Sequence, residues 1–249
     1  MNQRILVVIP AFNEEKTIAS IIGGLRDAAP DFDRVVVNDG SKDDTGEIVA
    51  ALGEKQLLLP CNLGYGRALQ TGLRYALLKG YDLIVSFDAD GQHHAEDVPR
   101  LIFVLNQSGA DLVIGSRYYH KQQHKTTCGR RLGQLIFSCL TLGLMGRRIY
   151  DTTSGFRALS RGACEVIVDG AFMDFHTETI VKLGLSGFDI VEVPITMEER
   201  CTGRSMHSFA SIFHYPLQTV LLTIVAVVDS LLTRRAKWPA RESASKESS

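Results

Sequence analysis

Short apolar, β-branched runs alternate with amphipathic stretches through the first half of the chain, and this alternation constrains the fold more than any other feature. The apolar runs are Ile5–Ile9, Arg34–Val37, Leu57–Leu59, Leu83–Phe87 and Asp111–Ile114. The amphipathic stretches between them are Glu14–Ala28, Asp43–Leu52, Gly66–Leu78 and Glu96–Asn106. Strands that alternate with helices of this length predict an α/β fold with a mostly parallel central sheet and helices on both faces.

The second half of the chain is less regular. Its spacing predicts a helix over Gly129–Gly146, another near Asp174–Leu185 and a last strand at Ile190–Val193. We therefore expect one main α/β domain over residues 1–212. Within 213–235, an apolar stretch is a little short of the roughly 20 residues that span a bilayer, which favours an interfacial or packing helix. A homodimer helix is the alternative, and 236–249 reads as a disordered tail.

Composition bears on two questions, namely whether the protein binds nucleic acid and in which cellular compartment it works. The formal net charge is -1, so no global field favours nucleic acid as a partner. Five cysteines form no CxxC pair and leave one over, which suits a reducing cytoplasm. The first apolar run ends at Pro10 and is followed by Glu14 and Glu15, unlike the core of a secretory signal. We expect a cytoplasmic protein.

Polar clusters follow three of the expected strands. They are Pro10–Glu14 after the first, Asn38–Ser41 after the second and Asp88–Gln92 after the fourth. Ligands of open parallel sheets bind beyond the carboxyl ends of the strands. The clusters are therefore expected to converge on one ligand-binding edge.

The strongest local signal is Asp88-Ala89-Asp90, which delivers two carboxylates at positions i and i+2. Mg²⁺ binds through one or two carboxylates together with substrate phosphates. Gln92 can add a neutral oxygen, so the sequence predicts a Mg²⁺ or Mn²⁺ site made of Asp88, Asp90 and Gln92. A pair of turn-forming aspartates is the simpler alternative. The adjacent His93-His94 pair is interpreted as solvated loop residues.

The other two clusters have both structural and functional interpretations. Asn38-Asp39-Gly40-Ser41 is typical of a turn that leads into a capped helix. A carboxylate at Asp39 can also accept hydrogen bonds from a nucleobase or ribose. Phe12, at the exit of the first strand, can pack against a base.

Taken together, these motifs resemble the family 2 glycosyltransferases with the GT-A fold, and among them the dolichol-phosphate mannose synthase-like, or polyprenyl-phosphate glycosyltransferase, branch. The resemblance covers roughly residues 4 to 205, and besides the clusters above it rests on three later motifs. These are Gly115-Ser116-Arg117-Tyr118, Asp151-Thr152-Thr153-Ser154-Gly155-Phe156-Arg157 and Val191-Glu192-Val193-Pro194-Ile195. Their joint order and spacing is far more specific than any one of them.

The resemblance implies roles for individual residues. The nucleotide-sugar site would comprise Pro10, Phe12, Glu14, Val37, Asp39, Asp88, Ala89, Asp90, Gln92, Arg117 and Arg204. Catalytic roles would fall to Asp90, Arg117, Asp151 and Arg204. Two departures matter: Phe12 stands where the family often has Tyr, and Met206 stands where it commonly has Lys. The phosphate role of a basic lid over 200–205 would therefore depend mainly on Arg204.

The implied activity is inverting transfer of a sugar from a GDP- or UDP-linked donor to a polyprenyl or dolichyl phosphate. A lipid phosphate is already a nucleophile, whereas a saccharide or protein hydroxyl needs a base, for which Asp151 and Glu178 are candidates. Asp151 is as readily interpreted as a cap of the following turn. The hydroxyl acceptor stays open as an alternative. A haloacid dehalogenase-like phosphatase and a catalytically silent sugar-nucleotide-binding protein are more distant ones.

A basic run favours the lipid acceptor. Residues 117–131 carry five Lys and Arg side chains and no acid, directly before the apolar-striped helix. Basic groups beside an amphipathic helix suit an anionic membrane surface or a phosphate headgroup, although a solvated loop is the commoner explanation of such a run. We expect peripheral association with the inner face of the membrane. A homo-oligomer remains open.

Overall fold

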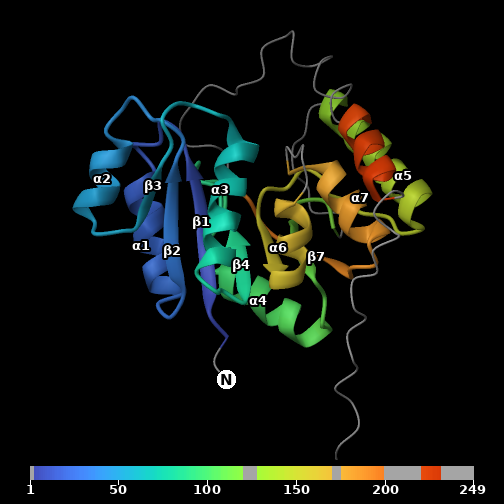
Figure 1. Ribbon diagram of the computed structural model, residues 1–249, viewed down its shortest axis with the longest axis horizontal. Helices are drawn as coiled ribbons and strands as arrows, with labels where there is room; N and C mark the ends of the chain where they lie inside the picture. The colour runs from blue at the N-terminus through green and yellow to red at the C-terminus, as the bar shows by residue number, and fades with distance from the viewer. Residues whose placement is uncertain (1–2, 120–127, 170–174, 199–219, 231–249) are drawn as a thin grey trace, which may run out of the picture.

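The computed structural model describes residues 3–119, 128–169, 175–198 and 220–230. Its strands are β1 (Ile5–Ala11), β2 (Asp33–Asn38), β3 (Gln56–Leu58), β4 (Leu83–Ser86), β5 (Leu112–Ser116), β6 (Arg157–Ser160) and β7 (Ile190–Pro194). Within the described ranges they form one sheet in the order β3-β2-β1-β4-β6-β5-β7 (Figure 1). The pairings are parallel except for those of β6 with β4 and β5, so the expected mostly parallel sheet is confirmed.

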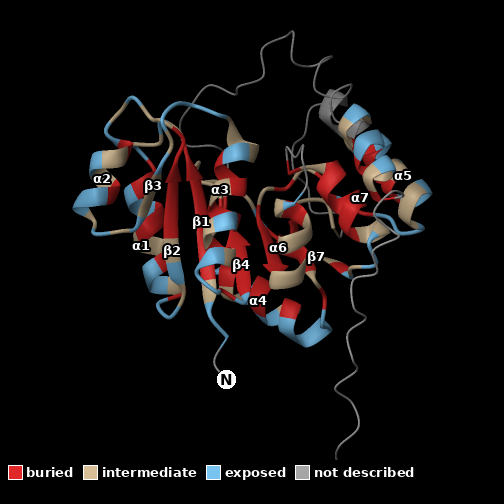
Figure 2. Cartoon of the chain, viewed as in Figure 1, coloured by how far each residue is buried: buried red, intermediate tan, exposed pale blue. Residues whose placement is uncertain are grey.

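Helices cover both faces of the sheet. They are α1 (Ile18–Ala28), α2 (Thr45–Ala51), α3 (Tyr65–Leu78), α4 (Asp97–Ser108), α5 (Cys128–Met145), α6 (Arg161–Val168) and α7 (Thr177–Leu185), followed by a helical segment at 220–230. Side chains alternate along β1 because successive residues of a strand point to opposite faces. Val7 and Ile9 join the core under α1, α2 and α4, whereas Leu6 and Val8 join the core under α3, α6 and α7. Figure 2 shows the resulting buried strands between two helical layers.

The strand order creates a switch point at β1. The chain runs from β1 outward to β2 and β3, and then returns to place β4 on the other side of β1. The carboxyl ends of β1 and β4 therefore meet where the strand order reverses, which is where open α/β sheets bind ligands. There the Thr17 hydroxyl donates a 2.7 Å hydrogen bond to the Ala89 carbonyl after β4, and the Asp39 amide after β2 donates a 2.9 Å bond to the Ala11 carbonyl at the end of β1. The three polar clusters thus converge as predicted.

One central strand was not anticipated from the sequence. β6 lies antiparallel between β4 and β5, with Ser86 paired to Arg157. The buried Arg157 guanidinium donates hydrogen bonds to the carbonyls of Ser154 and Thr152, at 2.8 and 3.0 Å. The Ser86 hydroxyl bonds to the Gly155 carbonyl at 2.6 Å. These bonds hold the 152–155 loop against the end of β4, beside Asp88.

Among the described residues, no helix combines the length and the apolar character needed to cross a membrane.

Close packing of α3 on β1 gives a first prediction. A Cβ at Gly72 would clash with Cγ1 of Val8, whereas a Cβ at Gly23 of α1 has no neighbour within 4 Å. Gly72→Ala is expected to lower the free energy of unfolding by about 1–3 kcal/mol through overpacking. Gly23→Ala, the matched control, is expected to raise it by up to about 1 kcal/mol through helix propensity. Urea unfolding measures both, and equal effects would contradict this packing.

Candidate active site

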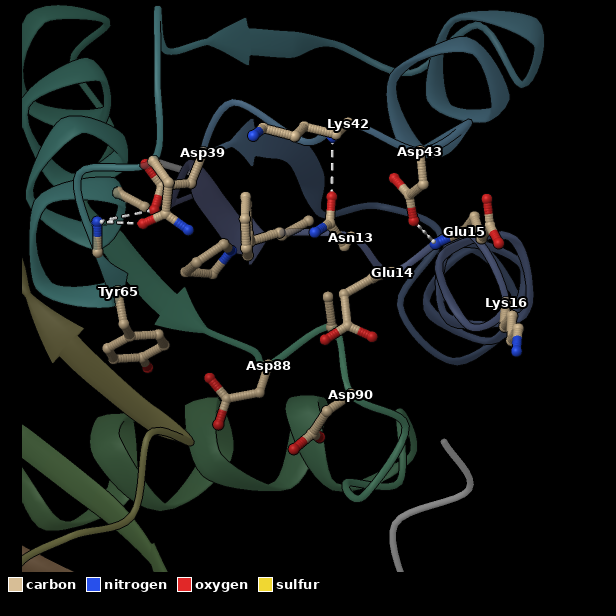
Figure 3. A pocket seen from close by; sticks show the side chains of 17 residues that line it. Asn13, Glu14, Glu15, Lys16, Asp39, Lys42, Asp43, Tyr65, Asp88 and Asp90 are labelled. Carbon is tan, nitrogen blue, oxygen red and sulfur yellow. Dashed lines mark hydrogen bonds between the residues drawn. The ribbon is translucent and has the colours of Figure 1, made fainter. Parts of the chain in front are cut away.

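A cavity of about 750 Å³ opens at the carboxyl ends of β1, β2 and β4 (Figure 3). This volume lies within the range of about 300–1,000 Å³ that is usual for small-molecule and cofactor sites. Of the residues predicted to bind a nucleotide sugar, those that line it are Pro10, Phe12, Glu14, Asp39, Asp88, Ala89 and Asp90. The sequence-based prediction of a ligand site at this edge therefore agrees with the geometry.

Other predicted residues lie elsewhere. The Val37 side chain is buried in the core under α3, where it faces Gly72, and it does not line the cavity. Gln92 turns toward the segment after β7, with its side-chain amide 3.4 Å from the Glu198 carbonyl. Arg204 and Met206 lie outside the described residues, as does most of the basic run between Arg117 and Arg131.

Asp88 sits at the inner corner of the cavity. Its Oδ2 lies 3.6 Å from Nε2 of His93. Its Oδ1 is buried and has no hydrogen-bond partner among the described residues. Burial alone would raise the pKa of the Asp88 carboxyl, but the neighbouring His93, Tyr65 and Arg117 hold that pKa below its usual value. Asp88 is therefore kept as a carboxylate with an unused acceptor.

His93 corrects an expectation from the sequence. The interpretation of His93 as a solvated loop residue is wrong, because its side chain is buried. Its ring centroid lies 4.9 Å from that of Phe156 and 6.0 Å from that of Phe87. An isolated antiparallel bridge to Met197 turns this residue inward, onto the aromatic pair.

The acids at this corner fit a divalent cation that is shared with a ligand. The described residues hold no group of three or more His, Cys, Asp or Glu side chains able to enclose a metal. Asp88 and Asp90 supply two carboxylates. The backbone amide of Gln92 donates a 3.1 Å hydrogen bond to Oδ1 of Asp90 and holds this carboxylate in place. Mg²⁺ suits such a site, because it takes its remaining ligands from water and substrate phosphates. The unused Oδ1 of Asp88 supports the same conclusion.

Asp39 anchors a loop as well as lining the cavity. Its two carboxylate oxygens accept hydrogen bonds from the amides of Leu63 and Gly64, at 2.8 and 2.9 Å. Gly64 directly precedes α3 and has a φ of +92, a backbone conformation that residues with a side chain rarely adopt. Asp39 therefore fixes the entry into α3, a role that the sequence did not indicate.

Arg117, directly after β5, forms an ion pair with the fully buried Asp151. The guanidinium donates to both Asp151 oxygens at 2.7 Å, and the Arg117 amide adds a 2.9 Å bond. Burial raises the pKa of the Asp151 carboxyl, but Arg117 outweighs it and holds that pKa below the usual value. A paired carboxylate of low pKa is a weak proton acceptor. This geometry makes Asp151 an anchor for Arg117 rather than an available base.

The second candidate base is also engaged. Glu178 is buried in the first turn of α7 and accepts a 3.0 Å hydrogen bond from the His176 amide. It does not line the cavity.

Several lining residues were missed by sequence reasoning, and they are Asn13, Lys42, Asn62 and Tyr65. Two of them show why. Asn13 has a φ of 56 and accepts a 2.8 Å hydrogen bond from the Lys42 amide, which ties the loop after β1 to the loop after β2. In the sequence, the only indication that these residues line a cavity is that they follow an expected strand.

Comparison with known proteins identifies the family. Residues 6–168 match the model described as Glycosyl transferase family 2. The chain belongs to this family. It is 35% identical to the polyprenol monophosphomannose synthase of Mycolicibacterium smegmatis, over 84% of this chain and 83% of that protein. It is 34% identical to the undecaprenyl-phosphate mannosyltransferase of Micrococcus luteus, over 82% of this chain and 88% of that protein.

A solved structure supports the fold. Glucosyl-3-phosphoglycerate synthase from Mycobacterium tuberculosis, crystallised with Mn²⁺, uridine diphosphate and phosphoglyceric acid, superposes with a TM-score of 0.66 at 22% identity. The match covers 92% of this chain and 78% of that one. At this identity the likeness establishes the shared GT-A architecture.

Proposed function

We propose that this glycosyltransferase moves a hexose from a GDP- or UDP-linked donor to a polyprenyl or dolichyl phosphate, with inversion, at the cytoplasmic face of the membrane. The observation that carries the proposal is the cavity at the switch point, with Asp88 and Asp90 at its inner corner. The relatives named as polyprenol and undecaprenyl-phosphate mannose transferases support the choice of acceptor.

The donor would occupy the cavity from its outer wall to the acidic corner. Phe12 offers an apolar face to the base, and the loop fixed by Asp39 closes the wall beside it. Asp88 and Asp90 would hold Mg²⁺ or Mn²⁺. Such an ion supplies positive charge where the leaving diphosphate develops negative charge, which is commonly the largest catalytic contribution.

The Arg117 guanidinium directly follows β5 and does not itself line the cavity. Held by Asp151, it would meet phosphate oxygens of the donor or acceptor in a fixed orientation. We propose that Arg204 contributes a second cation from the basic segment. Because a phosphate acceptor is already anionic at neutral pH, its attack needs no strong base, in agreement with the engagement of Asp151 and Glu178.

The direct test incubates the protein with radiolabelled GDP- and UDP-sugars, Mn²⁺ and polyprenyl phosphate. We expect a lipid-linked product together with release of nucleoside diphosphate. The unphosphorylated polyprenol is the matched acceptor control and is expected to give no product. If no common donor yields either lipid-linked sugar or nucleoside diphosphate, the proposed function is wrong.

Two helices expose large apolar side chains, and this exposure supports peripheral membrane association. In the helix at 220–230, the buried positions are small or hydroxylated, namely Thr223, Ala226 and Ser230. Its exposed positions are Leu221, Ile224, Val225 and Val228. In α5, Phe137, Ser138 and Thr141 are buried, whereas the exposed large hydrophobic residues are Leu135, Ile136 and Leu142. Figure 1 shows both helices at the same end of the molecule.

The exposed apolar side of the helix at 220–230 is held in place by an ion pair, and arginine side chains follow the neighbouring α5. Lys182 of α7 forms a 3.0 Å ion pair with Asp229, which fixes the helix at 220–230. The exposed Arg147 and Arg148 follow α5. An apolar face next to arginines fits the headgroup boundary of an anionic bilayer.

A vesicle experiment tests this association. The triple variant Leu221→Ser, Ile224→Ser, Val228→Ser is expected to bind vesicles of anionic phospholipid at least about tenfold more weakly, because apolar area is lost from the contact. The matched control replaces three exposed residues elsewhere, Leu58, Leu78 and Phe103, with Ser and is expected to bind like wild type. Equal losses in both variants, or a dimer that dissociates only in the first, would contradict membrane docking.

A further inference from the structure

Tyr65 links the two halves of the cavity. It is the first residue of α3 and directly follows Gly64, whose amide is held by Asp39. Its ring therefore starts from a backbone that is fixed by the end of β2. From there it extends across the cavity wall toward the end of β4, where Asp88 lies (Figure 3).

The Tyr65 hydroxyl ends in a tight corner. A Cβ placed on Gly155 would lie 2.6 Å from that hydroxyl, and 2.5 and 2.8 Å from the two Asp88 oxygens. All three oxygens therefore crowd around one point on the 152–155 loop. The Tyr65 hydroxyl and Oδ1 of Asp88 are both buried, and neither has a hydrogen-bond partner among the described residues.

These two atoms complement each other chemically. A phenol supplies one donor, whereas an ionised carboxylate only accepts. Leaving both buried groups unsatisfied is unfavourable, and a small rotation of either side chain would join them. A phenol is protonated at neutral pH because its ordinary pKa is about 10, so the hydroxyl is able to donate.

We propose that Tyr65 is a positioning residue for Asp88: its hydroxyl donates to Oδ1 of that carboxylate and fixes its orientation for a divalent cation. His93 steadies the other oxygen, Oδ2, at 3.6 Å. Each carboxylate oxygen has a second lone pair, so this hydrogen bond leaves room for a cation ligand. The inference rests on the proposed function, because it concerns the same cation and donor.

The anchor of Tyr65 also couples the two ends of the donor site. A ligand that tightens the Asp39 wall steadies the entry to α3, and with it the hydroxyl that orients Asp88. Tyr65 therefore makes cation binding stronger when a nucleoside diphosphate is present. This coupling distinguishes a positioning role from a purely structural one.

The test measures Mn²⁺ binding rather than turnover. Free Mn²⁺ is followed by electron paramagnetic resonance during titrations with UDP and GDP, using wild type, Tyr65→Phe and the control Tyr75→Phe. Tyr75 lies on the same helix, and its ring faces Lys55 and Lys79. Tyr65→Phe is expected to weaken Mn²⁺ binding in the presence of nucleotide by about tenfold or more, as loss of a supporting hydrogen bond does at metal sites. Nucleotide affinity without metal should be unchanged in Tyr75→Phe, and in Tyr65→Phe, which keeps the ring, it should change far less than Mn²⁺ affinity.

The outcomes separate this inference from the proposed function. If wild type shows no metal-dependent nucleotide binding, the proposed function fails. If wild type binds and Tyr65→Phe binds Mn²⁺ equally well, only the role of Tyr65 is wrong. A third outcome would also overturn the role of Tyr65. If Tyr65→Phe loses as much metal-free nucleotide affinity as Mn²⁺ affinity, or if its melting temperature without ligand falls clearly below that of wild type, the residue is structural.

Discussion

Replacing Asp90 or Asp88 with Ala is expected to lower the kcat/KM of sugar transfer by about 10²–10³-fold or more, the size of effect seen when a preorganised group that stabilises transition-state charge is removed. The two carboxylates face the same corner of the cavity and anchor the cation that the proposed reaction requires. Both residues sit in the turn after β4, so their loss should leave the core intact. Initial rates at saturating Mn²⁺ measure the effect.

Asp31→Ala is the matched control for these variants. Asp31 is an exposed acid between α1 and β2, so its replacement changes the net charge equally without touching the cavity. It should retain wild-type activity. If the Asp88 and Asp90 variants also do so, the acids do not serve catalysis.

Asp151→Ala is expected to produce the second large effect, on stability and activity together. Removing one partner of a buried ion pair leaves the other charge uncompensated and typically lowers stability by about 3–5 kcal/mol. Because Arg117 keeps 23% of its side chain exposed, we expect the lower end of this range. The pair stabilises the fold above the unfolded-state pKa near 3.8, and this contribution is lost as the pH falls through the lower folded-state pKa. Urea unfolding at neutral pH measures it.

A double variant distinguishes an anchor from a base. Arg117→Met combined with Asp151→Leu removes both charges and should recover most of the stability, because an apolar pair of similar volume carries no desolvation penalty. It should not recover activity, since the cation beside the cavity is gone. Asp151→Ala with wild-type stability and a loss of the acidic-limb pKa from the pH profile of kcat/KM would instead identify Asp151 as a base.

The sequence predicted most of the strands and the convergence of the polar clusters because their signals are local. Strands such as β1, β2 and β4 are apolar runs buried on both faces, and β1 alternates between two cores. β6 has no such signal. It has four residues, begins with the charged Arg157, and becomes a strand only because β4 and β5 pair with it on either side.

The same limit applies to the site. Motif spacing located Asp88 and Asp90, but it could not indicate that Asp39 would accept two loop amides or that His93 would turn onto Phe156. It also missed Tyr65, whose role depends on a contact with Asp88 across 23 positions of chain. Such features arise from tertiary packing between distant segments, which no local pattern records.

The central claim is that Asp88 and Asp90 hold a divalent cation against the diphosphate of the donor. Calorimetric titration of UDP and GDP into the protein, with and without Mn²⁺, tests it most directly when the Asp88→Ala, Asp90→Ala double variant is measured alongside. We predict that Mn²⁺ strengthens binding of at least one nucleotide to wild type and has no such effect on the double variant. Equal nucleotide affinity with and without Mn²⁺ in wild type, or an unchanged Mn²⁺ effect in the double variant, would contradict the claim.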